Sequence, residues 1–369
     1  MSERDVERLF AAVPADRAAE ARAWELVRAA YAEYEPARAR PRLRWAPAAA
    51  VLLCAVAAAA FSSPGRAVVD AVRRTIGVEH AAPALFRLPA PGRLLVSGTG
   101  GTWLVASDGS KRRLGAYTRA AWSPHGLFVV AATADELATL EPRTGSVHWT
   151  LSRPQIAFPR WGGSRTDTRI AYLTAGRLHV VAGDGTSDAA VRGLPAAAPV
   201  APAWRPGDRH VLAYVSTRGR VAVLDTDEGS VAWVSTGHAE PRALAWSPDG
   251  KTLALATARQ LVLFDGRTGR ARVRALAGAR AVAFSPQGRL AVLRDSTVLL
   301  VDGPRVRTLF TSPARLAGLA WSPNGHWLLT ALPGANQWVF VSERHVLAVS
   351  HVAQQFGGTP ALDGWRPGA

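Results

Sequence analysis

The sequence contains one cysteine, one methionine and two lysines among 369 residues. A single cysteine, Cys54, excludes an intramolecular disulfide framework and a metal centre built from cysteines. The nine histidines are dispersed, and the sequence has no His-x-x-x-His motif and no glutamate-flanked histidine pair of the kind that binds zinc. We therefore expect neither a metal nor a cofactor.

Sequence signatures of hydrolytic catalysis are also absent. No Gly-x-Ser-x-Gly motif predicts the nucleophile elbow of a hydrolase, and no hydrolase domain follows the repeats described below. Aspartates such as Asp184 and Asp265 fall in turns, where aspartate bonds locally to the backbone. The enzymatic alternative is glycoside hydrolysis by two carboxylates that come from distant segments and face each other across a ring of repeats. We expect no enzymatic activity.

The sequence contains fewer acidic than basic residues: it has 28 Asp and Glu and 44 Lys and Arg, which gives a formal net charge of +16. Such a surface suits acidic partners such as phospholipid headgroups or anionic wall polymers. An arginine-rich genome is the alternative explanation. No nucleic-acid-binding motif accompanies the charge, so we expect no nucleic acid partner.

What is abundant is one repeated turn, seen best in Trp246-Ser-Pro-Asp-Gly250. Pro248 presets φ for the turn, Asp249 can bond its own backbone, and Gly250 adopts a positive φ without a Cβ clash. The aromatic residues that anchor the related units are Trp122, Trp161, Trp204, Trp246, Phe284, Trp321 and Trp365. Their spacing of 37 to 44 residues, filled with short alternating strands, predicts a β-propeller.

Two incomplete ends set the expected number of blades. Strands expected over 93–97, 102–106 and 112–117 lack an anchor, whereas Trp365 is an anchor without following strands. Pairing the two ends completes one blade and leaves no free sheet edge. We expect an all-β fold, a seven-bladed propeller over 92–369 closed by the C-terminal strand, with six or eight blades as alternatives.

The segment before the propeller predicts a membrane anchor. Residues 1–44 combine a net acidic helical tail with a collar of arginines at 38, 40, 42 and 44. Residues 45–63 carry no charge and approach the length that crosses a bilayer as a transmembrane helix. The arginine collar predicts that the N-terminus stays in the cytoplasm. The expected location is the cytoplasmic membrane, with one span and the propeller outside.

Three other assignments compete for residues 45–63. They are a cleaved signal peptide, a lipoprotein attached through Cys54, and a soluble alanine-rich helix. Residues 64–91 predict an amphipathic juxtamembrane stem followed by a proline-rich linker.

The repeat of Trp246-Ser-Pro-Asp-Gly250 followed by Leu-Ala-Leu-Ala resembles the WD-repeat-like β-propeller repeats of TolB-type proteins over about 280 residues. This resemblance implies architecture and says little about chemistry. The outer turns at 140–145 and 224–229, with Trp149 and Trp233, resemble repeats of quinone-cofactor dehydrogenase propellers and their non-catalytic scaffold relatives. A tryptophan packed between blades is the alternative there. The order of segments resembles membrane proteins of actinobacterial type, mostly uncharacterised.

One unit departs from the repeat. The Trp161 unit lacks the Pro-Asp-Gly turn, and a loop that breaks a repeat without a packing reason is a candidate binding loop. A longer, solvated hairpin is the alternative. The candidate ligand- or partner-binding residues are Arg160, Arg165, Asp167 and Arg169. A second group near the expected ring closure consists of Asn336, Gln337, Gln354 and Gln355.

These observations predict a non-catalytic, membrane-anchored extracytoplasmic propeller that binds a protein or cell-envelope ligand as a scaffold or sensor. One alternative is a cell-envelope hydrolase with carboxylates in the propeller channel. Another is a membrane regulator whose cytoplasmic tail binds a transcription regulator such as a sigma factor.

Overall fold

The computed structural model describes residues 87–164, 166–207 and 210–368. The expected tail (1–44), the expected span (45–63) and residues 64–86 of the expected stem and linker (64–91) lie outside the described residues. Within the described ranges, no helix combines the length and apolar character needed to cross a membrane.

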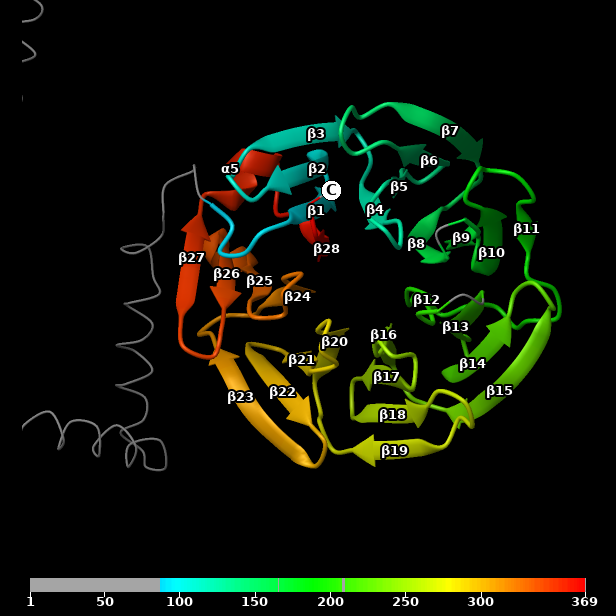
Figure 1. The fold of residues 1–369 in the computed structure, drawn as a ribbon. Coiled ribbons are helices and arrows are strands. Elements are labelled where there is room, and N and C mark those ends of the chain that lie inside the picture. The colour runs from blue at the N-terminus through cyan, green and yellow to red at the C-terminus, as the bar shows by residue number, and fades with distance from the viewer. Residues whose placement is uncertain (1–86, 165, 208–209, 369) are drawn as a thin grey trace, which may run out of the picture. The chain divides into compact units, whose positions relative to one another are not determined.

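Short, alternating apolar segments form seven four-stranded antiparallel sheets. Figure 1 shows these sheets as the blades of a ring around a common centre. In six of them the innermost strand is the first in sequence, and in the seventh it is the C-terminal strand. The expected all-β, seven-bladed propeller is therefore confirmed.

Blade 1 is built from both ends of the ring, and blades 2 to 7 each contain four consecutive strands. Blade 1 contains β28 (Ala361–Arg366), β1 (Arg93–Gly98), β2 (Gly101–Ala106) and β3 (Lys111–Gly115). Blades 2 to 4 contain β4 (Arg119–Trp122), β5 (Val129–Ala132), β6 (Glu136–Leu140), β7 (Val147–Ser152), β8 (Ala157–Gly163), β9 (Thr168–Thr174), β10 (Arg177–Ala182), β11 (Ala189–Ala190), β12 (Ala203–Trp204), β13 (Val211–Val215), β14 (Arg220–Asp225) and β15 (Ser230–Gly237). Blades 5 to 7 contain β16 (Pro241–Trp246), β17 (Thr252–Thr257), β18 (Leu261–Asp265), β19 (Ala271–Arg274), β20 (Ala279–Phe284), β21 (Leu290–Arg294), β22 (Thr297–Asp302), β23 (Arg305–Thr311), β24 (Ala317–Trp321), β25 (Leu328–Leu332), β26 (Gln337–Val341) and β27 (Val346–Ser350).

The ring closes through β28. This strand pairs antiparallel with β1, with Trp365 opposite Leu94, and Figure 1 shows the red C-terminal strand beside the cyan first strand at the inner rim. The preceding connection contains a short helix, α5 (Val352–Phe356), and the turn between β25 and β26 contains the 3₁₀ helix η1 (Pro333–Ala335). Closure gives β1 a partner on both sides and removes an open sheet edge.

The hydrophobic core lies between the blades. Each of its seven buried clusters joins side chains from two neighbouring blades, and together they complete the circle. One cluster, for example, packs Trp246 and Leu255 of blade 5 against Val223 of blade 4. Because every blade buries both of its faces, its inner strands are nearly continuous apolar runs.

The anchor tryptophans connect neighbouring blades by a recurring hydrogen bond. In four junctions the indole N–H donates to the carbonyl of the residue that precedes the previous anchor. The donor–acceptor pairs are Trp122–Gly364 (3.2 Å), Trp204–Arg160 (2.9 Å), Trp246–Ala203 (3.0 Å) and Trp321–Ala283 (3.1 Å). The indole thus satisfies its single donor while its ring fills the junction.

A second set of tryptophans connects blades at the outer rim. Trp149 Nε1 donates to Gly183 O at 3.0 Å, and Trp233 Nε1 donates to Gly266 O at 3.2 Å. In both cases the acceptor belongs to the next blade. The structure therefore gives the two outer tryptophans a packing role between blades.

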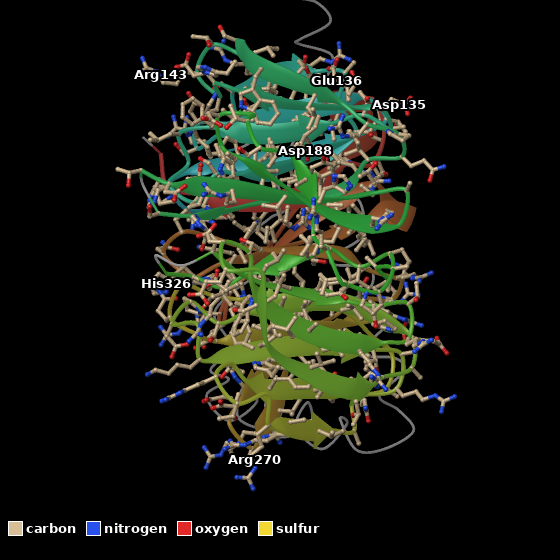
Figure 2. The ribbon with its side chains drawn as sticks, turned by 90° about the vertical axis from the view of Figure 1, so that its right-hand side faces the viewer. Asp135, Glu136, Arg143, Asp188, Arg270 and His326 are labelled. Carbon is tan, nitrogen blue, oxygen red and sulfur yellow. The ribbon has the colours of Figure 1, made fainter. Side chains whose placement is uncertain are left out.

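The two faces of the ring differ in the turns they carry. Figure 2 shows Arg143 and His326 on one side of the ring and Asp135 on the opposite side. The first two belong to turns that follow the inner strand or precede the outer strand of a blade, whereas Asp135 lies between the two middle strands. We call the side with Arg143 and His326 the anchor face, because the anchor turns lie on it.

Candidate functional site

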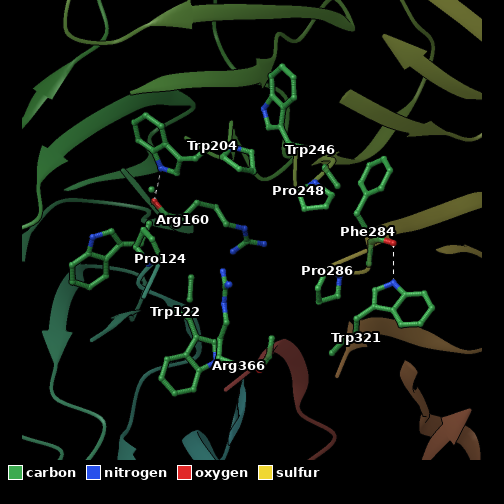
Figure 3. A pocket seen from close by; sticks show the side chains of 18 of the residues that line it. Trp122, Pro124, Arg160, Trp204, Trp246, Pro248, Phe284, Pro286, Trp321 and Arg366 are labelled. Carbon is green, nitrogen blue, oxygen red and sulfur yellow. Dashed lines mark hydrogen bonds between the residues drawn. The ribbon is translucent and has the colours of Figure 1, made fainter. Parts of the chain in front are cut away.

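The inner strands surround a central cavity of about 890 Å³, which we call the channel. All seven inner strands contribute to its lining. Figure 3 shows anchor tryptophans and the prolines of their turns around it, with Arg160 and Arg366 pointing into it. A concave site where several segments converge is a usual place for a ligand.

The residue before the anchor lines this channel in every blade except blade 4, and it is small in six blades. Ala121, Ala203, Ala245, Ala283, Ala320 and Gly364 occupy this position. In blade 3 the position holds Arg160, whose side chain projects into the channel (Figure 3). Its Nη1 donates to Pro159 O at 2.8 Å, and no ion pair joins its guanidinium to another described residue. An arginine at this position places a charge where the other blades place a methyl group or a hydrogen.

The position two residues before the anchor has one exception as well. It is apolar or proline in six blades, namely Ala120, Pro159, Pro202, Leu244, Val282 and Leu319. Blade 1 has Asp363 there, which is among the residues that line the channel. The register between β1 and β28 shifts at this point, so that Asp363 is the extra residue of a β-bulge. Bulges commonly redirect a side chain.

Asp363 has an unusual acidity. Burial raises its pKa to about 7, against the opposing effects of hydrogen bonding to Ser97 and of the charges of Arg160 and Arg119. Neither Asp363 Oδ2 nor the buried Ser97 hydroxyl has a partner at full hydrogen-bond geometry among the described residues, so their interaction is weak. This carboxyl therefore changes its charge near neutral pH.

Two further arginines lie along the channel wall. Arg366 follows the anchor Trp365, and burial inside the ring lowers the pKa of its guanidinium, although the residue as a whole is exposed in the open channel. It has no hydrogen bond or ion pair within the part of the chain that the structure describes. Arg205 lies over the ring of Trp246, 5.6 Å from its centre. The channel lining thus contains three guanidinium groups and one carboxyl group.

The structure separates the four residues of the candidate loop. Arg160 lines the channel, and Arg165 lies outside the described residues. Asp167 and Arg169 lie between blades 3 and 4, where Arg169 pairs with Asp167 and, at 3.6 Å, with Asp227. His210 completes this group, since its Nδ1 lies 2.5 Å from Asp227 Oδ2.

The irregular loop of blade 3 has a packing role. A Cβ at Gly162 would lie 2.2 Å from Cγ of Trp204, so the indole ring occupies the space of a side chain there. Gly163 has φ near +107°, and a Cβ at this residue would lie 2.4 Å from Asp167 O. Gly162 thus lets the Trp204 anchor seat against blade 3, and Gly163 lets the turn close on Asp167. This is the packing reason that the sequence did not reveal.

The second predicted group surrounds helix α5. Asn336 Nδ2 donates to Gln354 Oε1 at 2.6 Å, and Asn336 Oδ1 accepts from the Ala353 N–H at 2.6 Å. Gln355 accepts from Lys111 at 2.5 Å. Gln337 is apart from these three: it is 2 % exposed, and its amide has no hydrogen bond to any described residue. The first three therefore hold α5 against the ends of blades 7 and 1.

The described ranges offer no evident metal centre. They contain no group of three or more His, Cys, Asp or Glu residues placed to hold a metal ion.

Asp363 and Arg366 are channel residues that were not among the predicted site residues. Their signal is visible only when the seven units are aligned on their anchors. Asp363 then contrasts with six apolar or proline residues, and Arg366 contrasts with four serines and a glycine, although Arg205 shares its position. Inspecting the loops alone could not find it.

Comparison with known proteins supports the fold. No protein-family model matches the sequence, and no curated protein matches it. The β-propeller domain of Cps50 (Swd1) from Myceliophteria thermophila is similar in structure, with 15% identity, a TM-score of 0.53, and coverage of 64% of this chain and 86% of that domain chain. A chain of the Mitotic Checkpoint Complex is similar with 17% identity, a TM-score of 0.56, and coverage of 73% and 93%. The chain has a WD-repeat-like β-propeller fold. At these identities the WD-repeat-like similarity concerns the fold alone.

Proposed function

We propose that this WD-repeat-like propeller is a membrane-anchored extracytoplasmic protein that binds a protein or cell-envelope ligand and catalyses no reaction. The observation that carries the proposal is the channel, where charged side chains replace small and apolar ones at two repeat positions. Polar groups that converge in a concave site are typical of ligand recognition. The rigid ring holds them in place, because each blade packs against two neighbours.

Similarity to a propeller from a protein assembly favours a binding role. One similar chain belongs to a structure of the Mitotic Checkpoint Complex, a protein assembly, and another is the propeller domain of Cps50 (Swd1). A propeller presents turns on two faces and at its rim, all of which can contact a partner. A protein partner is therefore a natural expectation for this chain too.

Membrane anchoring is proposed from the sequence. The uncharged residues 45–63 follow the arginines at 38–44, an order that favours a span with the N-terminus inside. The test is protease treatment of intact cells that express the full chain with a C-terminal epitope. We expect loss of the epitope before lysis, with a cytoplasmic protein as the intact control. Survival of the epitope until lysis would contradict the topology.

The hydrolase alternative depends on paired carboxylates. Glycoside hydrolysis by the common mechanism requires two, about 5 to 10 Å apart. Among the described residues that line the channel, Asp363 supplies one carboxyl and no second one accompanies it. The purified full chain should therefore release no sugar from cell-wall polysaccharide. Release that Asp363→Asn abolishes would replace the binding proposal by an enzymatic one.

A further inference from the structure

The channel has an excess of positive charge that the protein does not neutralise. Arg160, Arg205 and Arg366 line it, and Asp363 is the one carboxyl among the described lining residues. None of the three guanidinium groups forms an ion pair within 4 Å to a described carboxylate. Because a concave site with low-dielectric walls focuses the field of the charges that line it, these charges act more strongly on a ligand than the same charges on an open surface would.

The arginines also have unused hydrogen-bond donors. A guanidinium carries five N–H groups, yet Arg160 makes one side-chain hydrogen bond, to Pro159 O, and Arg366 makes none within the described residues. Both side chains point into the cavity (Figure 3). Arginine pairs with the oxygens of phosphate and carboxylate groups through two parallel N–H bonds, which makes it the usual residue for such anions.

The repeat pattern shows that these charges are not needed for folding. Five blades have alanine and one has glycine where blade 3 has Arg160, and four blades have serine at the position of Arg366. Those serines accept a backbone N–H within their own anchor turn, as Ser247 does from Thr252 at 2.9 Å. A blade therefore forms with a small residue at either position, so the two arginines serve another purpose.

From the lining, the unused donors and the repeat exception together, we infer that the channel binds an oxyanion, the phosphate or carboxylate group of a ligand, through Arg160 and Arg366. This inference rests on the proposed function, since it names the chemistry of one ligand of the same site. A cavity of about 890 Å³ exceeds the volume of a phosphate or a carboxylate, so the anion is one group of a larger molecule.

The test is calorimetric titration of the purified full chain at constant ionic strength. Inorganic pyrophosphate is the phosphate probe, and citrate is the carboxylate probe. We expect the wild-type chain to bind at least one of them with a dissociation constant below about 1 mM. Whichever probe binds more tightly identifies the source of the oxyanion, and either result supports the inference. Binding of neither probe would overturn it.

Three variants locate the site. Arg160→Ala and Arg366→Ser install residues that other blades already have, and each should weaken binding about tenfold, with about a hundredfold loss in the double variant. Arg270→Ala is the matched control, because Arg270 is an exposed arginine at the rim (Figure 2) and its removal lowers the net charge equally. The control should bind within twofold of wild type. A double variant that binds like wild type, or a control that loses as much affinity, would overturn the inference.

Failure of this inference is distinguishable from failure of the proposed function. The titration uses purified protein and is independent of topology, whereas protease treatment of cells reports topology without any anion. Thermal unfolding midpoints of the variants show whether the ring is intact. If protease removes the epitope from intact cells and the purified chain binds neither probe, the proposed membrane anchoring stands and only the oxyanion site is refuted.

Discussion

Blade 5 and blade 3 occupy equivalent places in the ring, yet they use the same two positions differently. In blade 5, Ala245 precedes the anchor and the Trp246 indole donates to Ala203 O. In blade 3, Arg160 precedes the anchor and the buried Trp161 indole N–H has no hydrogen bond to a described residue. The position that is only structural in one blade therefore carries a charge into the channel in the other.

Blade 3 lacks two stabilising features that other blades have. Its turn contains Gly162 and Gly163 in place of Ser-Pro, and its indole forgoes the hydrogen bond that four other junctions make. Stacking of Trp161 on Phe128, with ring centres 6.1 Å apart, and the seating of Trp204 against Gly162 compensate by packing. Residues that follow the repeat thus indicate a role in stability, and residues that depart from it indicate positions with another function.

The largest predicted effect concerns blade 1, which depends on both ends of the propeller. Deleting residues 361–369 removes β28, exposes the edge of β1 and takes Trp365 from its core cluster. We expect loss of a cooperative melt, or a midpoint lowered by more than about 10 °C, in circular dichroism. Deleting only 367–369, which lie beyond β28, is the control and should leave the midpoint unchanged. Equal midpoints for the two deletions would contradict closure as a source of stability.

The sequence predicted the fold far better than the site. Anchor spacing and the complementary ends were sufficient for seven blades, because both depend on local turn chemistry and period-two patterning. Which channel positions carry charge depends on the alignment of seven inner strands in space. Arg160 stands out in the sequence through its irregular neighbours in the loop, whereas the β-bulge that contains Asp363 is visible only in the register of β28 against β1. Arg366 follows a regular anchor and gives no local signal either.

The same reasoning fails at the glycines of blade 3. In the sequence, Gly162 belongs to a loop without a visible packing reason, but the atoms that require a glycine belong to Trp204, 42 residues later in the chain. Contacts between blades connect segments about 40 residues apart, and a single sequence does not show which aromatic side chain packs against which backbone segment. Binding and packing explanations for an irregular loop therefore separate only in three dimensions.

The second prediction sharpens the contrast between Asp363 and the apolar residues at its repeat position. Because the pKa of Asp363 is raised to about 7 in the folded chain, against 3.8 for an ordinary aspartate, the fold binds a proton that the unfolded chain releases. Its stabilising effect is complete below the unfolded pKa and is lost as the pH rises through about 7. Unfolding free energy, measured in urea, should therefore fall between pH 4 and pH 7.5 by on the order of 2 kcal/mol from this group, a value reduced because Asp363 is partly exposed.

Asp363→Asn should remove this part of the pH dependence and make the chain more stable than wild type at pH 8. Asp135→Asn is the matched control, because Asp135 is an exposed carboxylate on the side opposite the anchor face (Figure 2). It should leave the slope with pH unchanged. An identical slope in wild type and Asp363→Asn would show that the carboxyl is not held neutral by its surroundings.

The third prediction tests the indole hydrogen bond directly. Trp246→Phe keeps an aromatic ring at the junction but loses the bond to Ala203 O, so the unfolding free energy should fall by about 1 kcal/mol beyond the effect of the smaller ring. Trp161→Phe loses no such bond and should cost less, since its indole N–H is already unpaired among the described residues. Chemical denaturation of both variants gives the difference. Equal losses would mean that ring volume, and not the hydrogen bond, sets the contribution of the anchors.

The smallest predicted effect separates the loop of blade 3 from the channel wall. Arg169 pairs with Asp167 and, across the junction with blade 4, with Asp227, and all three side chains are partly exposed. Ion pairs of this kind contribute about 0.5 kcal/mol, and salt screens them. Arg169→Ala should lower the unfolding free energy by about that amount at low salt and by less in 1 M NaCl. Because Arg169 does not line the channel, its removal should leave pyrophosphate and citrate affinities within twofold, as in Arg270→Ala. A tenfold loss, equal to that expected for Arg160→Ala, would instead place the anion at the junction of blades 3 and 4, where Arg169 supplies the charge.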